Sequence, residues 1–276
     1  MYKIIDKKIL NRAVELMVVH APYVARKCRP GQFIILRVDE EGERIPLTIV
    51  DYDRQAQTVT IIYQIMGYST KRLAKKNIGD TICDFAGPLG EPSVLKKHKK
   101  VLGIGGGVGA APLYPQIKTL TKMGVQCDII IGGRSAEFVL LEDKFKALGC
   151  NVEIATDDGS KGVKGFVTDI LKDKLAQGET YDEVIAIGPL MMMRAVVDVT
   201  KPIDLPTSVS LNPIMIDGTG MCGGCRVTVG GKTKFACVDG PDFDGLLVDF
   251  EEVIRRQGIY KEEEHQCRIG ITRGEK

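Results

Sequence analysis

Three cysteines near the C-terminal end of the chain restrict its fold more than any other feature. Cys222 and Cys225 form a C-x2-C pair within the segment DGTGMCGGC, and Cys237 follows twelve residues later. The intervening VTVGGKTKF alternates in polarity around two glycines, as a β-hairpin does, and would return Cys237 to the pair. Thiolates at this spacing hold iron or zinc. The sequence therefore predicts a small, loop-rich unit built around a metal centre.

A fourth ligand is expected from the position of Asp217. It stands five residues before Cys222, where loops of the form C-x4-C-x2-C…C have their first cysteine. An aspartate before a glycine is also a common turn residue, but its register with the cysteines favours ligation. Zinc is the alternative for the whole site, although zinc prefers Cys and His and no histidine lies nearby. The expected ligands of a 2Fe–2S cluster are Asp217, Cys222, Cys225 and Cys237.

A glycine-rich segment in the middle of the chain predicts a nucleotide site. VLGIGGGVGAAPLYP, residues 101–115, reads as a buried strand, a glycine cluster and a helix. Such a loop lets a pyrophosphate approach the backbone, and the helix N-terminus supplies N–H donors. The G-x-G-x-x-G spacing is not kept, so a plain strand–helix turn is the alternative. The expected nucleotide contacts are Gly105, Gly106, Gly107, Val108 and Gly109.

Apolar runs and helical stretches alternate through the same region. The runs cover residues 101–104, 127–131, 152–155 and 183–187, and helices are expected over 111–122, 136–148, 166–176 and 190–199. This alternation predicts a parallel α/β sheet, in which ligands bind beyond the carboxyl ends of the strands. Arg134, Gly188 and Pro189 fall at those ends.

The first 90 residues are instead rich in β-strand patterns. Alternating or apolar runs at 13–19, 32–38, 45–50 and 58–65 predict a small antiparallel barrel, interrupted by a short helix over 70–76. The expected domains are a barrel over 1–97, a nucleotide-binding α/β domain over 98–208 and an iron–sulfur unit over 209–276. The lysine-rich segment 96–100 is either a solvated linker or a docking patch for an acidic partner.

Composition excludes several classes of protein. A net charge of +2 argues against a nucleic-acid binder. The sequence contains no stretch of about 20 apolar residues, so no membrane span is expected. The first residues are charged and do not resemble a secretory signal. Eight cysteines without such a signal favour metal ligation over disulfides, and we expect a cytoplasmic protein.

The order of barrel, nucleotide loop and cysteine unit resembles the ferredoxin–NADP reductase superfamily. More narrowly, the chain is similar to the electron-transfer subunits of dihydroorotate dehydrogenase and to the small subunits of NADH-dependent reduced ferredoxin:NADP oxidoreductases. The segments RIPLT (44–48), IYQ (62–64) and GYST (67–70) resemble the FAD-binding strands and pyrophosphate loop of the superfamily. Tyr63 could equally be a core residue. The resemblance implies FAD contacts from Pro46, Leu47, Thr48, Ile62, Tyr63, Gln64, Gly67, Ser69 and Thr70. The segment TDDGSKGVKGFVTD (156–169) resembles the nicotinamide-domain loop of the superfamily, which implies a nucleotide contact from Asp157, with a plain turn as the alternative.

The resemblance also implies an activity. It points to an oxidoreductase subunit that moves electrons between NAD(H), FAD and a 2Fe–2S cluster, with NAD(H) preferred to NADP(H) and no catalytic acid–base residue. Dihydroorotate subunits usually have a cysteine at the position of Asp217, whereas the ferredoxin:NADP oxidoreductase subunits have aspartate.

That aspartate favours an electron-bifurcating complex. Its other subunit would be a larger FAD and iron–sulfur flavoprotein, and ferredoxin would be reached through the complex. The alternatives are an electron-transfer subunit of NAD-dependent dihydroorotate dehydrogenase and, from another class, a zinc-stabilised nucleotide-binding regulatory module.

Overall fold

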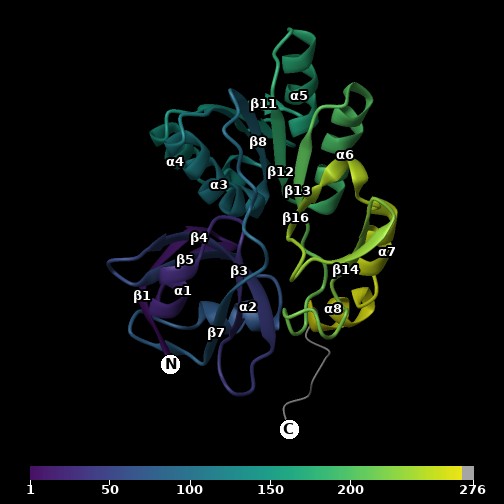
Figure 1. Ribbon diagram of the computed structural model, residues 1–276. Helices are drawn as coiled ribbons and strands as arrows, with labels where there is room; N and C mark the ends of the chain where they lie inside the picture. Colours follow the sequence, from purple (N-terminus) through teal and green to yellow (C-terminus); the bar gives the residue numbers. More distant parts are fainter. Residues whose placement is uncertain (269–276) are drawn as a thin grey trace.

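The computed structural model describes residues 1–268, which form two seven-stranded sheets and a two-stranded hairpin (Figure 1). The N-terminal sheet and the second sheet lie one above the other, and the C-terminal unit lies beside both. No helix within the described residues combines the length and the hydropathy that a membrane span requires.

The N-terminal sheet is antiparallel and curls into a nearly closed barrel, as expected. Its strands run in the order β6-β1-β2-β5-β4-β3-β7, with a core of alternate inward-facing side chains. All four predicted strands are present, whereas three strands and one helix were not predicted. The elements are β1 (Tyr2–Asn11), β2 (Val14–His20), α1 (Pro22–Lys27), β3 (Phe33–Arg37), β4 (Arg44–Asp53), β5 (Thr58–Gln64), α2 (Tyr68–Ala74), β6 (Thr81–Ile82) and β7 (Asp84–Leu89).

The second sheet is parallel except at one edge, in the order β11-β10-β9-β8-β12-β13-β16, which confirms the predicted α/β sheet. Helices α3 and α4 lie on one side of it and α5 and α6 on the other (Figure 1). The elements are β8 (Lys100–Gly106), α3 (Ala110–Lys122), β9 (Gln126–Gly133), α4 (Glu142–Ala147), β10 (Asn151–Thr156), β11 (Val163–Lys164), α5 (Val167–Ala176), β12 (Glu183–Ile187), α6 (Leu190–Thr200), β13 (Thr207–Ser210) and β16 (Asp242–Asp244).

The prediction of one continuous helix over 136–148 is wrong. A 3-10 turn at Ala136–Phe138 and α4 are separated by Leu141, whose φ of 61° lies in the left-handed region. The last residue of the lysine-rich segment 96–100 is part of the second sheet. Lys100 begins β8, and its Nζ lies 3.0 Å from the Asp128 carboxylate.

The C-terminal unit contains the predicted hairpin of β14 (Arg226–Val229) and β15 (Lys232–Phe235), followed by α7 (Phe250–Gln257) and α8 (Lys261–Arg268). The domain boundary expected after residue 208 falls inside β13, and β16 from the C-terminal segment pairs with β13. One hydrophobic core accordingly contains residues of all three parts, such as Ile35, Ile104 and Cys237.

Candidate functional site

A cavity of about 950 Å³ lies between the barrel and the carboxyl edge of the parallel sheet. It receives residues from both sheets and from the segment that leads from β13 toward the cysteines. Fourteen of the residues predicted for cofactor binding line it. They are Pro46, Leu47, Thr48, Ile62, Tyr63, Gln64, Gly106, Gly107, Val108, Gly109, Arg134, Asp157, Gly188 and Pro189.

Strands β4 and β5 form the barrel wall of this cavity. Because strand side chains alternate, neighbouring residues of β5 face opposite ways. Ile62 packs with residues of α3, whereas the Tyr63 ring is buried in the barrel, where its hydroxyl donates to Glu15 Oε2 at 2.6 Å. Lys7 Nζ lies 3.3 Å from the same carboxylate. Tyr63 therefore borders the cavity while its side chain serves the barrel core.

Two glycine loops form the opposite wall, and their backbones touch. A Cβ atom on Gly109 would lie 2.2 Å from the carbonyl oxygen of Ile187 and 2.6 Å from Gly188 Cα, so only glycine fits there. Among the described residues, no side chain caps the start of α3. The N–H of Ala110 donates to carbonyl oxygens of the preceding turn, and Pro112 has no N–H, so the positive end of the helix dipole is the feature that suits a phosphate here. Gly105 does not line the cavity and instead packs against Ala110.

The first residues of helix α2 lie outside the cavity, although the resemblance gives them a pyrophosphate role. Thr70 Oγ1 accepts hydrogen bonds from the N–H groups of Met66 (3.0 Å) and Gly67 (3.2 Å). Ser69 Oγ donates to Glu43 Oε2 at 3.3 Å. Gly67, Ser69 and Thr70 therefore stay predictions as FAD contacts.

The cysteine site is an irregular loop over residues 217–225 that the β14–β15 hairpin completes. The Sγ atoms of Cys225 and Cys237 lie 3.2 Å apart, and both side chains are buried. Burial and the neighbouring Cys225 thiol raise the pKa of Cys237 to about 12. Cys222 is exposed, and its Sγ accepts the N–H of Gly224 at 3.4 Å. The hairpin thus returns Cys237 as its sequence predicts.

Asp217 lies at the start of this loop as an ionised carboxylate. Its two oxygens accept the N–H groups of Thr219 and Cys222, each at 2.9 Å. These backbone hydrogen bonds, first from Thr219 and then from Cys222, lower the pKa of the Asp217 carboxyl. Asp217 therefore already has the charge of a metal ligand, in contact with the backbone of Cys222.

The four predicted donors occur as two pairs. A 2Fe–2S cluster needs two ligand pairs rather than one compact group. The Cys225 and Cys237 sulfurs form such a pair, and Cys222 and Asp217 supply one thiol and one carboxylate from the same loop.

Sequence reasoning missed some residues that line the cavity. Phe166, 66% exposed, stands on its rim at the start of α5, and Met191, 60% exposed, follows Pro189. Met193 is buried in the core, whereas Met191 and Met192 line the cavity. The 3.6-residue helical period separates Met191 from Met193 and could have distinguished them.

Two family descriptions match this chain. Residues 104–198 match the oxidoreductase NAD-binding domain, and residues 212–249 match the iron–sulfur cluster binding domain of dihydroorotate dehydrogenase B. The second match covers the four predicted cluster ligands and replaces the zinc alternative. The chain is accordingly an oxidoreductase subunit with an NAD-binding domain and an iron–sulfur domain.

Relatives and solved structures extend the match to the whole chain. A dihydroorotate dehydrogenase B (NAD(+)) electron transfer subunit homolog from Thermotoga maritima is 45% identical over 246 residues, 89% of this chain and 86% of the relative. The corresponding subunit from Fusobacterium nucleatum is 36% identical, over 82% of this chain and 89% of its own.

A chain of the NADH-dependent reduced ferredoxin–NADP oxidoreductase structure is 41% identical, with a TM-score of 0.92 over 99% of this chain and 98% of that one. A ferredoxin NADP+ reductase from Neisseria gonorrhoeae, 17% identical with a TM-score of 0.55 over 71% of this chain and 89% of its own, shares the fold alone. From these matches, the chain belongs to the family of dihydroorotate dehydrogenase B electron-transfer subunits.

Proposed function

We propose that this chain moves electrons between NAD(H), FAD and a 2Fe–2S cluster as the small subunit of an electron-bifurcating NADH-dependent reduced ferredoxin:NADP oxidoreductase. The observation that carries the proposal is that strand β3 lies between the cofactor cavity and the cysteine loop. Strand β3 pairs with β4, which lines the cavity, and its residue Ile35 lies against Gly218 of the cysteine loop. Electrons would have a short path through the fold.

The chain's own residues bind and orient the reactants. Pro46, Leu47 and Thr48 would lie along a flavin ring, because β4 presents them to the cavity opposite the glycine loops. The N-terminus of α3 would hold a dinucleotide phosphate. The flavin would accept an electron pair from NADH and release single electrons to the cluster.

Met191, Met192 and Phe166 would limit access of water to the nicotinamide side, because they form an apolar rim. No side chain of this cavity needs to transfer a proton in the proposal. Arg134 and Asp157 are the charged residues of the cavity lining, and we assign them to the adenosine end of NAD(H).

The partner is a larger flavoprotein subunit with FAD and iron–sulfur centres, and ferredoxin would react through that complex. Two observations favour this complex over dihydroorotate oxidation. The chain of the bifurcating enzyme matches nearly its full length, and Asp217 occupies the position at which dihydroorotate subunits usually have cysteine.

An electron-transfer subunit of NAD-dependent dihydroorotate dehydrogenase is the second candidate. It is favoured by the Thermotoga maritima and Fusobacterium nucleatum relatives and by the iron–sulfur family match. The two candidates share NAD(H), flavin and cluster, so they differ in the partner subunit and in the role of Asp217.

The first experiment is an anaerobic visible and EPR spectrum of the purified chain, with iron and FAD quantified before and after NADH is added. About two irons and one FAD per chain, with a 2Fe–2S signal that NADH generates, are expected. Absence of flavin would overturn the proposal. Purifying the chain with its native partner then separates the candidates, since only a dihydroorotate dehydrogenase would reduce NAD+ with dihydroorotate.

A further inference from the structure

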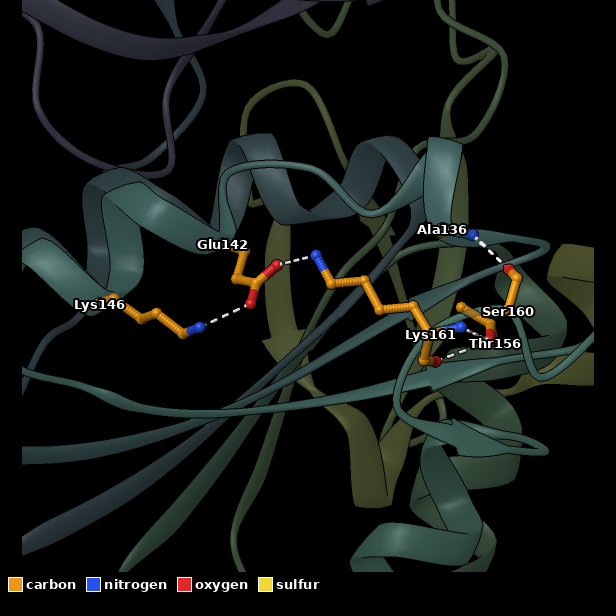
Figure 2. Close-up of polar contacts among 6 residues, drawn as sticks. All are labelled: Ala136, Glu142, Lys146, Thr156, Ser160 and Lys161. Carbon is orange, nitrogen blue, oxygen red and sulfur yellow. Dashed lines mark hydrogen bonds and ion pairs between the residues drawn. The ribbon is translucent and has the colours of Figure 1, made fainter.

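The loop after β10 is tied to the segment before α4 by a hydrogen-bond network (Figure 2). Thr156 Oγ1 donates to the carbonyl oxygen of Lys161 at 2.7 Å and accepts its N–H at 3.1 Å. The N–H of Ala136 donates to Ser160 Oγ at 2.7 Å. The loop over residues 157–164 is therefore closed on itself and fixed to the neighbouring connection.

Glu142 completes the network from the first residue of α4. Its Oε1 accepts from Lys146 Nζ at 2.7 Å, and its Oε2 forms an ion pair with Lys161 Nζ (Figure 2). The Glu142 side chain is mostly buried, whereas the Lys146 side chain is largely exposed. Hydrogen bonds from Lys146 and Lys161 lower the pKa of Glu142. The ammonium group of Lys161 is thus committed to an ionised carboxylate.

The network fixes the backbone from which Asp157 enters the cavity. The N–H of Asp157 donates to the carbonyl oxygen of Gly133 at 3.1 Å, so the ends of β9 and β10 stay together. Asp157 lines the cavity, and among the described residues no side chain or backbone group pairs with its carboxylate. A free carboxylate at such a strand end accepts a ribose 2′-hydroxyl and repels a 2′-phosphate.

We propose that Glu142 is a specificity-determining positioning residue of the nucleotide site. By holding Lys161, it keeps the loop in the position that presents Asp157 to the adenosine ribose, and it withholds a cation that could otherwise reach a 2′-phosphate. The site consequently prefers NAD(H) to NADP(H). This inference rests on the proposed function, because it assigns the cavity between Arg134 and Asp157 to the adenosine end of the dinucleotide.

The test compares three single variants of the FAD-loaded chain, with anaerobic flavin reduction measured at varied NADH and NADPH. Glu142→Gln keeps the shape of the side chain and removes its charge, so Lys161 is released as a free cation. The ratio of kcat/KM for NADPH to that for NADH should rise about fivefold. This is the factor expected from one new, partly exposed ion pair between Lys161 and the 2′-phosphate. The KM for NADH should rise while kcat stays nearly constant.

Lys161→Met and Lys146→Met are the matched comparisons. Lys161→Met also opens the network but removes the cation, so KM for NADH should rise without a gain for NADPH. Lys146→Met removes the exposed partner of Glu142 and should leave both nucleotides unaffected. A merely structural role would change the two nucleotides in parallel and leave their ratio constant.

Two results separate failure of this inference from failure of the proposed function. If wild-type flavin is not reduced by NADH, the proposed function is wrong. If wild-type flavin is reduced but Glu142→Gln leaves the NADPH to NADH ratio unchanged, or Lys161→Met raises it equally, the role of Glu142 is wrong.

Discussion

Gly218 of the cysteine loop lies directly against Ile35 of barrel strand β3. A Cβ atom on Gly218 would be 2.9 Å from Ile35 Cγ1, and the φ of Gly218 is 74°. Ile35 pairs with Pro46 on β4, so a single strand separates the cysteine loop from the predicted flavin segment. Both the backbone conformation and the close contact require glycine at this position.

Replacing Gly218 with alanine should therefore displace the cysteine loop. The left-handed conformation costs a non-glycine residue about 1–2 kcal/mol, and the contact with Ile35 adds to this. We expect lower iron per chain with the FAD content unchanged, measured on the anaerobically purified protein. Gly231→Ala is the control, because Gly231 has the same φ of 74° but open space around its Cβ position. Equal iron loss in both variants would show that strain alone is responsible.

Substitution of Asp217 should separate ligation from turn formation. Asp217→Asn keeps an oxygen that can accept the N–H of Thr219 or Cys222 but lacks the negative charge of a ligand. If Asp217 is a cluster ligand, the Asp217→Asn variant should lose iron or change its EPR spectrum. The Asp217→Cys variant should then keep two irons, with a shifted reduction potential of the cluster. If Asp217 only forms the turn, Asp217→Asn will retain the wild-type spectrum and Asp217→Cys will weaken the loop.

The sequence allowed much of the fold to be predicted because its signals are local. The four predicted barrel strands are alternating or apolar runs, and the segment 101–115 has the strand–glycine–helix order that is typical of parallel α/β sheets. The same locality explains the failure at residues 136–148, where the helical pattern hides the left-handed Leu141. β1 was missed because its charged residues do not follow a clean alternation.

The cavity was predictable in part, because its glycine loops and flavin strands have recognisable motifs. The contact between Gly218 and Ile35 could not be predicted, because it joins segments far apart in the sequence that carry no complementary pattern. The ion pair between Glu142 and Lys161 could not be predicted either, because lysine and glutamate side chains usually face solvent.

Lys118 links helix α3 to barrel strand β4 and should affect how the nucleotide-binding domain moves relative to the barrel. Its Nζ donates to Asp51 Oδ1 and Oδ2 at 2.7 and 2.9 Å, which links α3 to β4. Lys118→Met should lower stability by about 0.5–1 kcal/mol and slow flavin reduction at saturating NADH. Thermal unfolding and stopped-flow absorbance measure the two effects. The exposed Lys122, for which the described residues provide no ion pair, gives the control Lys122→Met, and equal rates in both variants would contradict a role for the bridge.

Asp242 should make the stability of the chain depend on pH. Part of the residue reaches solvent, but its Oδ1 is buried without a partner among the described residues, and its Oδ2 accepts from Ser93 Oγ (2.5 Å) and Gln116 Nε2 (3.1 Å). Burial raises the pKa of this carboxyl above its usual value of 3.8, although the neighbouring polar side chains of Ser93, Ser210 and Gln116 oppose the rise.

The sign of the pH effect follows from which state holds the proton. Between the two pKa values, folded Asp242 retains a proton that the unfolded chain has released. Stability should therefore fall as pH rises from the unfolded pKa through the folded one, and each unit of difference corresponds to about 1.4 kcal/mol or roughly 2–4 °C in Tm. Asp242→Asn cannot titrate, so it should lose this part of the pH dependence. Thermal unfolding of both proteins from pH 4 to pH 8 tests this, and parallel curves would mean that the carboxyl is ionised in the folded chain.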